Sequence, residues 1–190
     1  MEQKGVIEIR WHGRGGQGAV TSAELLAKAA INEGKYAQAF PAFGPERRGA
    51  PVVAFNRISA TSPIRVRAGI TEPDVVVVLD ETVLRVVKVT DGLAKGGIVV
   101  VNSKKPAADL KSGLGDHWRL ATIDATRIAR ETIGVPIVNT TMLGALIKAT
   151  GVVETESLVE PLRERFGRLA DRNINAMKRA VEETAMEELH

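Results

Sequence analysis

Four glycines lie between an apolar segment and a helical pattern, in the heptapeptide His12-Gly13-Arg14-Gly15-Gly16-Gln17-Gly18. The preceding residues 5–11 are predicted to form a strand, and residues 19–33 carry leucine and alanine at helical spacing. A strand that enters a helix through glycines lets backbone N–H groups approach an anion, and the helix N-terminus adds partial positive charge. The pattern therefore predicts a βα unit with a phosphate-binding turn.

Short apolar segments alternate with helical patterns along the remaining sequence. Residues 75–79 and 98–101 are continuous apolar runs, which are typical of buried parallel strands. Further strands are predicted at 36–40, 52–58, 63–68 and 118–123, an extended piece at 135–138, and helices at 81–88, 125–133 and 139–150. This alternation favours an α/β fold, with one doubly wound, largely parallel sheet in a single domain that covers residues 1–190.

Two additions to that sheet are expected. Segments 52–58 and 63–68 are joined by a short Ser/Thr/Pro turn, and the second alternates apolar residues with arginines, so a two-stranded insert is predicted. Beyond about residue 156 the pattern is mostly helical, with breaks near Pro161 and Gly167, and predicts a helical C-terminal tail. Prolines and glycines in 41–50 predict an irregular loop.

Composition excludes several classes of function. The chain has no cysteine, which excludes disulfides, zinc–thiolate sites and iron–sulfur clusters held by its own thiolates. Its histidines, His12, His117 and His190, lie far apart, so no metal site is predicted. A net charge of +3 with only 4% aromatic residues does not favour nucleic-acid binding. Without a long apolar run or a secretory signal pattern, we expect no membrane span and a cytoplasmic location.

The ligand of the glycine turn remains open between two phosphorylated cofactors. Gly13, Gly15 and Gly18 fit G-x-G-x-x-G, but segment 36–40 is not followed by the carboxylate that would hold the ribose of NAD. The next loop instead carries Arg47 and Arg48, whose guanidinium groups suit the extra phosphate of NADP or of coenzyme A. Arg14, inside the turn, is a third candidate. Alternatively, Arg48 pairs with Glu46 or with a partner, and Arg14 is only solvated.

Polar residues follow most of the predicted core strands: His12, Asp80, Asn102, Asp124 and Asn139. Ligands of open α/β sheets bind at this edge, yet the three residues that precede helices, Asp80, Asp124 and Asn139, are expected to cap them. No nucleophile elbow, Walker lysine or His-Glu metal helix is present, so no catalytic residue is predicted.

Several segments together resemble the gamma subunit of 2-oxoacid:ferredoxin oxidoreductases, with the pyruvate enzyme, pyruvate synthase, the most similar. The resemblance rests on the glycine turn combined with Phe40-Pro41-Ala42-Phe43-Gly44-Pro45-Glu46-Arg47-Arg48-Gly49-Ala50-Pro51. It continues through Arg57-Ile58, Pro73–Val76, Val101–Ser103 and Asn139–Ala145, and it thins after about residue 165.

The resemblance implies a subunit that has no activity alone, in a complex that oxidatively decarboxylates a 2-oxoacid with coenzyme A and ferredoxin. Thiamine diphosphate and iron–sulfur clusters would belong to the alpha, beta and delta partner subunits. This chain would help to bind coenzyme A through Gly13, Arg14, Gly15, Gly16, Gln17 and Gly18, with Arg47 and Arg48 reading phosphate or completing a subunit contact. Residues 139–145 would pack at an interface, and a homodimer contact is expected. The alternatives are a free-standing NADP-binding reductase and a pure scaffold subunit.

Overall fold

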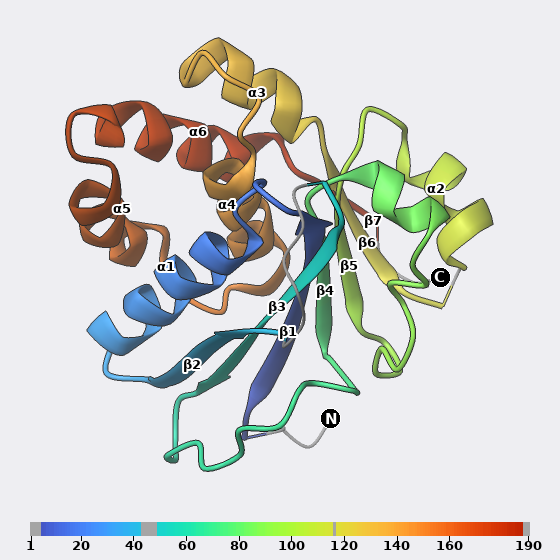
Figure 1. Ribbon diagram of the computed structural model, residues 1–190, viewed down its shortest axis with the longest axis horizontal. Helices are drawn as coiled ribbons and strands as arrows, with labels where there is room; N and C mark the ends of the chain where they lie inside the picture. Colours follow the sequence, from blue (N-terminus) through green and yellow to red (C-terminus); the bar gives the residue numbers. More distant parts are fainter. Residues whose placement is uncertain (1–4, 43–48, 116, 188–190) are drawn as a thin grey trace.

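The computed structural model describes residues 5–42, 49–115 and 117–187, and its centre is a seven-stranded sheet (Figure 1). The strand order is β2-β3-β1-β4-β5-β6-β7. The strands are β1 (Ile7–Arg14), β2 (Tyr36–Pro41), β3 (Pro51–Ser59), β4 (Val75–Val78), β5 (Ile98–Asn102), β6 (Arg119–Ile123) and β7 (Ala185–Glu187). The α-helices are α1 (Ala19–Asn32), α2 (Ala107–Leu114), α3 (Ala125–Thr132), α4 (Asn139–Thr150), α5 (Val159–Phe166) and α6 (Ala170–Glu183). Short 3-10 helices are η1 (Glu81–Arg85), η2 (Thr155–Leu158) and η3 (Gly167–Leu169).

The predicted α/β class is confirmed, with a parallel centre formed by β1, β4, β5 and β6. The outer strands β3, β2 and β7 run antiparallel to their neighbours. The helical C-terminal region is also confirmed, and a final short strand, β7, follows it.

The predicted two-stranded insert is wrong. β3 lies inside the main sheet, where it pairs with β1 from Ile7↔Ile58 to Arg14↔Pro51 and with β2 on its other side. Residues 63–68 form no strand. This mostly exposed segment is held instead by side chains of the sheet, because Gln38 donates to the carbonyl of Ile64 and Arg57 to that of Val66.

Smaller differences concern short elements. The segment predicted as helix 81–88 is the 3-10 helix η1, and 135–138 forms no strand. Helix α2 was not predicted, although Leu110 and Leu114 lie one turn apart and are both buried, because Gly113 interrupts an already short pattern. Strand β7 has only three residues, which is too short for a periodicity to be recognised.

One face of the sheet is covered by more helices than the other. In Figure 1, α1, α3, α4, α5 and α6 lie on one side, and α2 lies on the other beside β5 and β6. The larger core lies under the first group and includes apolar residues of α4, a helix that is buried over nearly its whole length. Gly144 lets α4 approach α6 closely, since a Cβ there would lie 2.1 Å from the carbonyl oxygen of Met177. The helix pair therefore packs nearly backbone to backbone.

Asn56 of β3 joins three elements inside the larger core. Its Oδ1 accepts a hydrogen bond from the Trp11 indole N–H (2.8 Å), and its Nδ2 donates to the carbonyls of Ala23 (2.8 Å) and Gln38 (3.2 Å). Asn56 and Trp11 are both fully buried. Because a buried polar group without a partner is costly, this asparagine fixes how β1, α1 and β2 sit around β3.

On the opposite face of β1, the half-buried Arg10 contacts the buried His12. Arg10 donates its Nε–H to His12 Nε2 (3.1 Å) and reaches the backbone carbonyls of Val89 and Asp91. Burial, followed by the nearby charge of Arg10, lowers the pKa of His12 to about 3. His12 is therefore a neutral hydrogen-bond acceptor in this fold. It lies within β1 rather than after it, and its side chain is engaged by Arg10.

We expect Asn56→Leu to lower the free energy of unfolding by about 2–4 kcal/mol, because the Trp11 N–H and two carbonyls lose their partner inside the core. Urea unfolding followed by circular dichroism measures this loss. The exposed Asn32→Leu is the matched control and should change stability by no more than about 0.5 kcal/mol. Equal effects for the two variants would contradict the role of Asn56.

We expect stability to fall as the pH drops below about 6.5, because the unfolded state protonates His12 near its ordinary pKa while the folded state resists protonation down to about 3. The limiting slope is about 1.4 kcal/mol per pH unit. Urea titrations between about pH 7.5 and 5, above the carboxylate range, measure it. His12→Gln keeps an acceptor for Arg10 and should remove the slope; an unchanged slope would show that another group causes it.

Candidate functional site

The glycine turn has two kinds of glycine. Gly13 lies within β1, paired with Val52, and a Cβ there would come within 3.1 Å of Leu79 Cδ1. Gly16 and Gly18 have positive φ angles of 90° and 85°, a region that favours glycine. At Gly18 a Cβ would also lie 2.8 Å from Asn139 Nδ2. The predicted turn is thus confirmed as a turn, although the strand before it runs on to Arg14.

The side chain of Gln17 holds the turn in place. Its Oε1 accepts the Arg14 backbone N–H (2.7 Å) and its Nε2 donates to Asp80 Oδ2 (2.7 Å). Asp80 also accepts from the backbone N–H and hydroxyl of Thr82. Although partial burial opposes it, the hydrogen bonds from Thr82 and Gln17 and the charge of Arg14 lower the pKa of Asp80. The Gln17 side chain therefore joins the turn to Asp80 through contacts within the chain, and its predicted role in ligand binding stays a prediction.

Arg14 is partly engaged by its surroundings. Its Nε donates to Thr82 Oγ1 (2.9 Å) and lies 3.6 Å from Asp80 Oδ2, and its Nη1 donates to the carbonyl of Gly49 (3.0 Å). The side chain keeps 28% of its surface exposed. Arg14 is thus fixed in position while part of its guanidinium group still faces solvent.

A small cavity of about 250 Å³ opens at the start of α1. Its lining consists of Arg14, Gly15, Gly16, Gly18, Ala19, Val20, Thr21 and Val52. Helix α1 has no side-chain cap and no acidic residue in its first turn. Its first ladder bond runs from Ser22 N–H to the carbonyl of Gly18, so the N–H groups before it are the ones that a helix leaves for an anion.

The predicted ligands Arg47 and Arg48 lie outside the described residues. The described Gly49, which follows them in the sequence, contacts the turn: its N–H donates to the carbonyl of Gly15, and its own carbonyl accepts from Arg14. Gly49 thus lies against the glycine turn.

Two of the three predicted caps are confirmed. Asp80 caps η1 through Thr82, and Asp124 caps α3 through the Arg127 backbone N–H (2.9 Å). Asn139 is instead the first residue of α4, where its Oδ1 accepts from the Thr140 N–H while its side chain lies against Gly18. The expectation that residues 139–145 pack at a subunit interface is wrong, since all of them are buried inside this chain.

A larger cavity of about 530 Å³ lies at the carboxyl ends of the parallel strands. It is lined by Gly16, Gln17, Leu79, Asp80, Glu81, Asn102, Ser103, Lys104, Lys105, Asp124, Thr126, Arg130, Pro136, Ile137 and Val138. Gly16 lines both cavities, so the glycine turn lies between them. Sequence reasoning placed polar residues at this edge but missed Arg130 and the apolar segment 136–138, which follow no strand directly.

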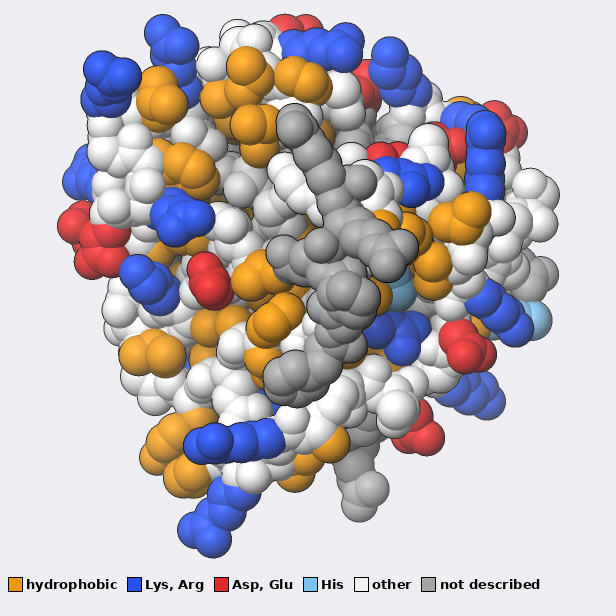
Figure 2. All heavy atoms as spheres, in the orientation of Figure 1, with side chains coloured by type: hydrophobic (Ala, Val, Ile, Leu, Met, Phe, Trp, Pro, Cys, Tyr) orange, Lys and Arg blue, Asp and Glu red, His pale blue; other side chains and the backbone are white. Residues whose placement is uncertain are grey.

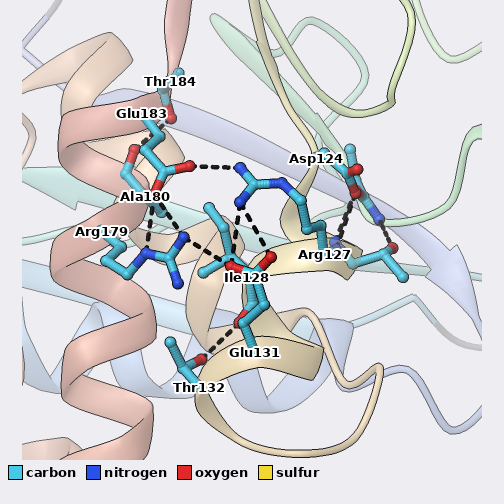
Figure 3. A network of polar contacts seen from close by, with 11 residues as sticks. Asp124, Arg127, Ile128, Glu131, Thr132, Arg179, Ala180, Glu183 and Thr184 are labelled. Atoms are coloured by element: carbon cyan, nitrogen blue, oxygen red, sulfur yellow. Dashed lines mark hydrogen bonds and ion pairs between the residues drawn. The ribbon is translucent and has the colours of Figure 1, made fainter.

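A network of charges fastens α3 to α6 beside the larger cavity (Figure 3). Arg127 pairs with Glu131 on its own helix and with Glu183 of α6, and Arg179 of α6 pairs with both carboxylates. Hydrogen bonds to Arg179 and Arg127, respectively, are the main cause that lowers the pKa of Glu131 and of Glu183. All four groups remain partly exposed, so the network's main effect is on the orientation of α3.

The face of the molecule shown in Figure 2 carries no single charged stripe among the side chains coloured there. Lys and Arg side chains are dispersed among acidic and apolar groups in Figure 2. Within residues 5–42, 49–115 and 117–187, no group of three or more His, Cys, Asp or Glu side chains is placed to hold a metal ion. In the same part of the chain, no helix has the length and apolar character needed to cross a membrane.

Known proteins match this chain over almost its whole length. The model of the family described as pyruvate ferredoxin/flavodoxin oxidoreductase matches residues 8–183. The common gamma subunit of pyruvate/ketoisovalerate oxidoreductases from Thermococcus litoralis is 54% identical over 186 residues, which are 97% of this chain and 100% of that protein.

Solved structures agree with the sequence match. The crystal structure of pyruvate oxidoreductase subunit PORC from Thermotoga maritima has a TM-score of 0.87 and 41% identity, and the match covers 97% of this chain and 100% of that one. The fold also occurs in 2-oxoglutarate:ferredoxin oxidoreductase from Magnetococcus marinus, with a TM-score of 0.75, 21% identity, and coverage of 94% of this chain and 31% of that one. The chain belongs to the pyruvate ferredoxin/flavodoxin oxidoreductase family, as a gamma-type subunit of a multi-subunit 2-oxoacid oxidoreductase.

Proposed function

We propose that this gamma subunit contributes part of the coenzyme A site to an oxidoreductase that converts pyruvate or a related 2-oxoacid, coenzyme A and oxidised ferredoxin into acyl-coenzyme A, CO2 and reduced ferredoxin. The observation that carries the proposal is the small cavity at the start of α1, where Arg14 and uncapped helical N–H groups meet without an acidic residue in the helix's first turn. Phosphate groups are well suited to a cavity with such donors.

Comparison with a relative's ligand supports the same choice. The Magnetococcus marinus enzyme that shares this fold was solved with 2-oxoglutarate, coenzyme A and succinyl-CoA bound. Coenzyme A carries a pyrophosphate and a further phosphate on its ribose, and Arg47 and Arg48 are the residues we propose for additional phosphate contacts. The Thermococcus litoralis relative is a gamma subunit common to pyruvate and ketoisovalerate oxidoreductases, so we assign the choice of 2-oxoacid to other subunits.

The chemistry itself is proposed to take place on the alpha, beta and delta subunits, with ferredoxin as the electron acceptor. Iron–sulfur clusters would be held there, since this chain has no cysteine to supply a thiolate. Thiamine diphosphate is proposed to be held there as well. The polar groups near the turn already serve the fold: Asp80 and Asp124 cap helices, and His12 is buried and neutral. In this proposal the gamma subunit binds and positions coenzyme A and contributes to assembly of the complex.

The NADP-binding reductase is less well supported. β2 is an antiparallel edge strand separated from β1 by β3, so it does not stand where the second strand of a dinucleotide fold presents its ribose-binding carboxylate. A pure scaffold subunit is the alternative that the contacts of Arg14 with Thr82 and Gly49 favour, and the first experiment below separates it from the coenzyme A proposal.

In the assembled complex, we expect Arg14→Ala to raise KM for coenzyme A about tenfold, a loss of about 1.4 kcal/mol, because one guanidinium–phosphate contact disappears. KM for pyruvate should stay unchanged. Steady-state kinetics measure both values. Thr82→Val removes a hydrogen bond that positions Arg14 but keeps the charge of Arg14, so we expect a smaller rise in KM for coenzyme A. Arg172→Ala, at an exposed position of α6, is the control for the loss of one positive charge. An equal KM for coenzyme A in all variants would favour the pure scaffold subunit.

The purified chain should show no 2-oxoacid oxidation, because the polar groups nearest the turn, Asp80, Asp124 and His12, are engaged in the fold and not placed as acid, base or nucleophile. Mixing it with a complex that lacks the gamma subunit should restore coenzyme A-dependent ferredoxin reduction, followed by absorbance. Turnover by the chain alone would contradict the division of labour, as would full activity of the complex without it.

A further inference from the structure

The larger cavity is not used by the proposed function. It lies on the other side of the glycine turn from the small cavity and is bounded by the ends of β4, β5 and β6. Its volume of about 530 Å³ is in the range of small-molecule sites, and the carboxyl ends of parallel strands are where such folds bind ligands.

The acidic groups around this cavity are already engaged. Glu81 accepts from the hydroxyl of Ser103 (2.7 Å) and pairs with Lys105. The hydrogen bond from Lys105 is the main cause that lowers the pKa of Glu81. Asp80 and Asp124 are held by the contacts described above. Asp80 and Glu81 thus each have a cationic partner within the chain, whereas Asp124 accepts a backbone N–H.

Two cations at the same cavity are free. Lys104 and Arg130 line it and are exposed, and neither side chain has a hydrogen bond or ion pair with any residue of the described ranges. Lys104 follows β5 and Arg130 stands on α3, so two separate elements bring them to one opening. Two unpaired cations, one on a helix and one after a strand, are well suited to bind an anion between them.

An apolar segment forms another part of the wall. Pro136, Ile137 and Val138 line the cavity, and Ile137 is 48% exposed, whereas most of the large apolar side chains that the structure describes are buried. Exposed apolar groups at the rim of a polar cavity indicate a ligand that brings apolar surface of its own. Inorganic phosphate alone would leave this segment unused.

The walls are held rigidly. Asn102 donates to the carbonyl of Leu79 (2.9 Å) and to the hydroxyl of Thr126 (3.0 Å), which joins β5, β4 and α3 at the cavity floor. The charged network of Figure 3 fastens Arg127 and Glu131, on either side of Arg130 in the sequence, to α6. These contacts hold the backbone of α3 from which Arg130 projects.

From these contacts we infer that the larger cavity is a second ligand site, for a phosphate ester that carries a flat apolar group, the chemistry of a nucleotide. The phosphate lies between Lys104 and Arg130, and the apolar group rests on Pro136 and Ile137. The inference goes beyond the proposed function, because none of these four residues lines the cavity at the start of α1.

Calorimetric titration of the full chain with adenosine 5′-monophosphate tests the site. We expect one molecule bound per chain, and a loss of at least about tenfold in affinity for the Lys104→Ala/Arg130→Ala double variant. Ile137→Ser should weaken adenosine 5′-monophosphate and leave inorganic phosphate unchanged. Lys95→Ala/Arg172→Ala removes the same charge from exposed positions outside the cavity and should bind normally.

Absence of binding, equal binding by the two double variants, or equal affinity for adenosine 5′-monophosphate and inorganic phosphate would overturn the inference. A competition arm identifies the source of the ligand. If coenzyme A displaces adenosine 5′-monophosphate and weakens in the Lys104→Ala/Arg130→Ala variant, the cavity holds part of coenzyme A. If both bind together, it holds a separate nucleotide. The Arg14→Ala kinetics test the small cavity independently, so either proposal can fail alone.

Discussion

The contact between Gly18 and Asn139 fixes where α1 begins, and the geometry of the site depends on that point. A Cβ at Gly18 would lie 2.8 Å from the Asn139 side-chain nitrogen, which is a steric clash, so glycine lets the two helix starts meet. The Ser22 hydroxyl donates to the carbonyl of Asn139 and strengthens the contact. Because α4 packs closely against α6 at Gly144, the position of the small cavity at the start of α1 depends on packing deep in the core.

This dependence gives a physical reason for the motif Asn139–Ala145. Its resemblance to known gamma subunits led to an expectation of an intersubunit contact, whereas its side chains complete the core of one chain. Asn139 supports the turn, Thr140 donates to Asn173 on α6, and Gly144 admits the α6 backbone. A shared motif in this position therefore reflects how the site is supported from within.

Much of the fold could be predicted from sequence, because β4 and β5 are continuous apolar runs and α1 has a clear helical pattern. Strand direction and neighbours could not, since β3 carries buried Asn56 and Arg57 whose partners are distant in sequence. For the site, the glycines were predictable from the backbone they require. The engagement of Gln17 with Asp80, 63 positions away, was not, because it exists only after β1 and β4 have paired.

Both edges of the sheet end in ways that discourage further strand addition. β7 covers the edge of β6 and is held there by an ion pair between Glu187 and Lys111. On the opposite edge β2 ends at Pro41, which has no N–H to donate. A three-residue strand at one edge and a terminal proline at the other disfavour edge-to-edge pairing between copies of this chain, so we expect contacts with other subunits to use faces and loops.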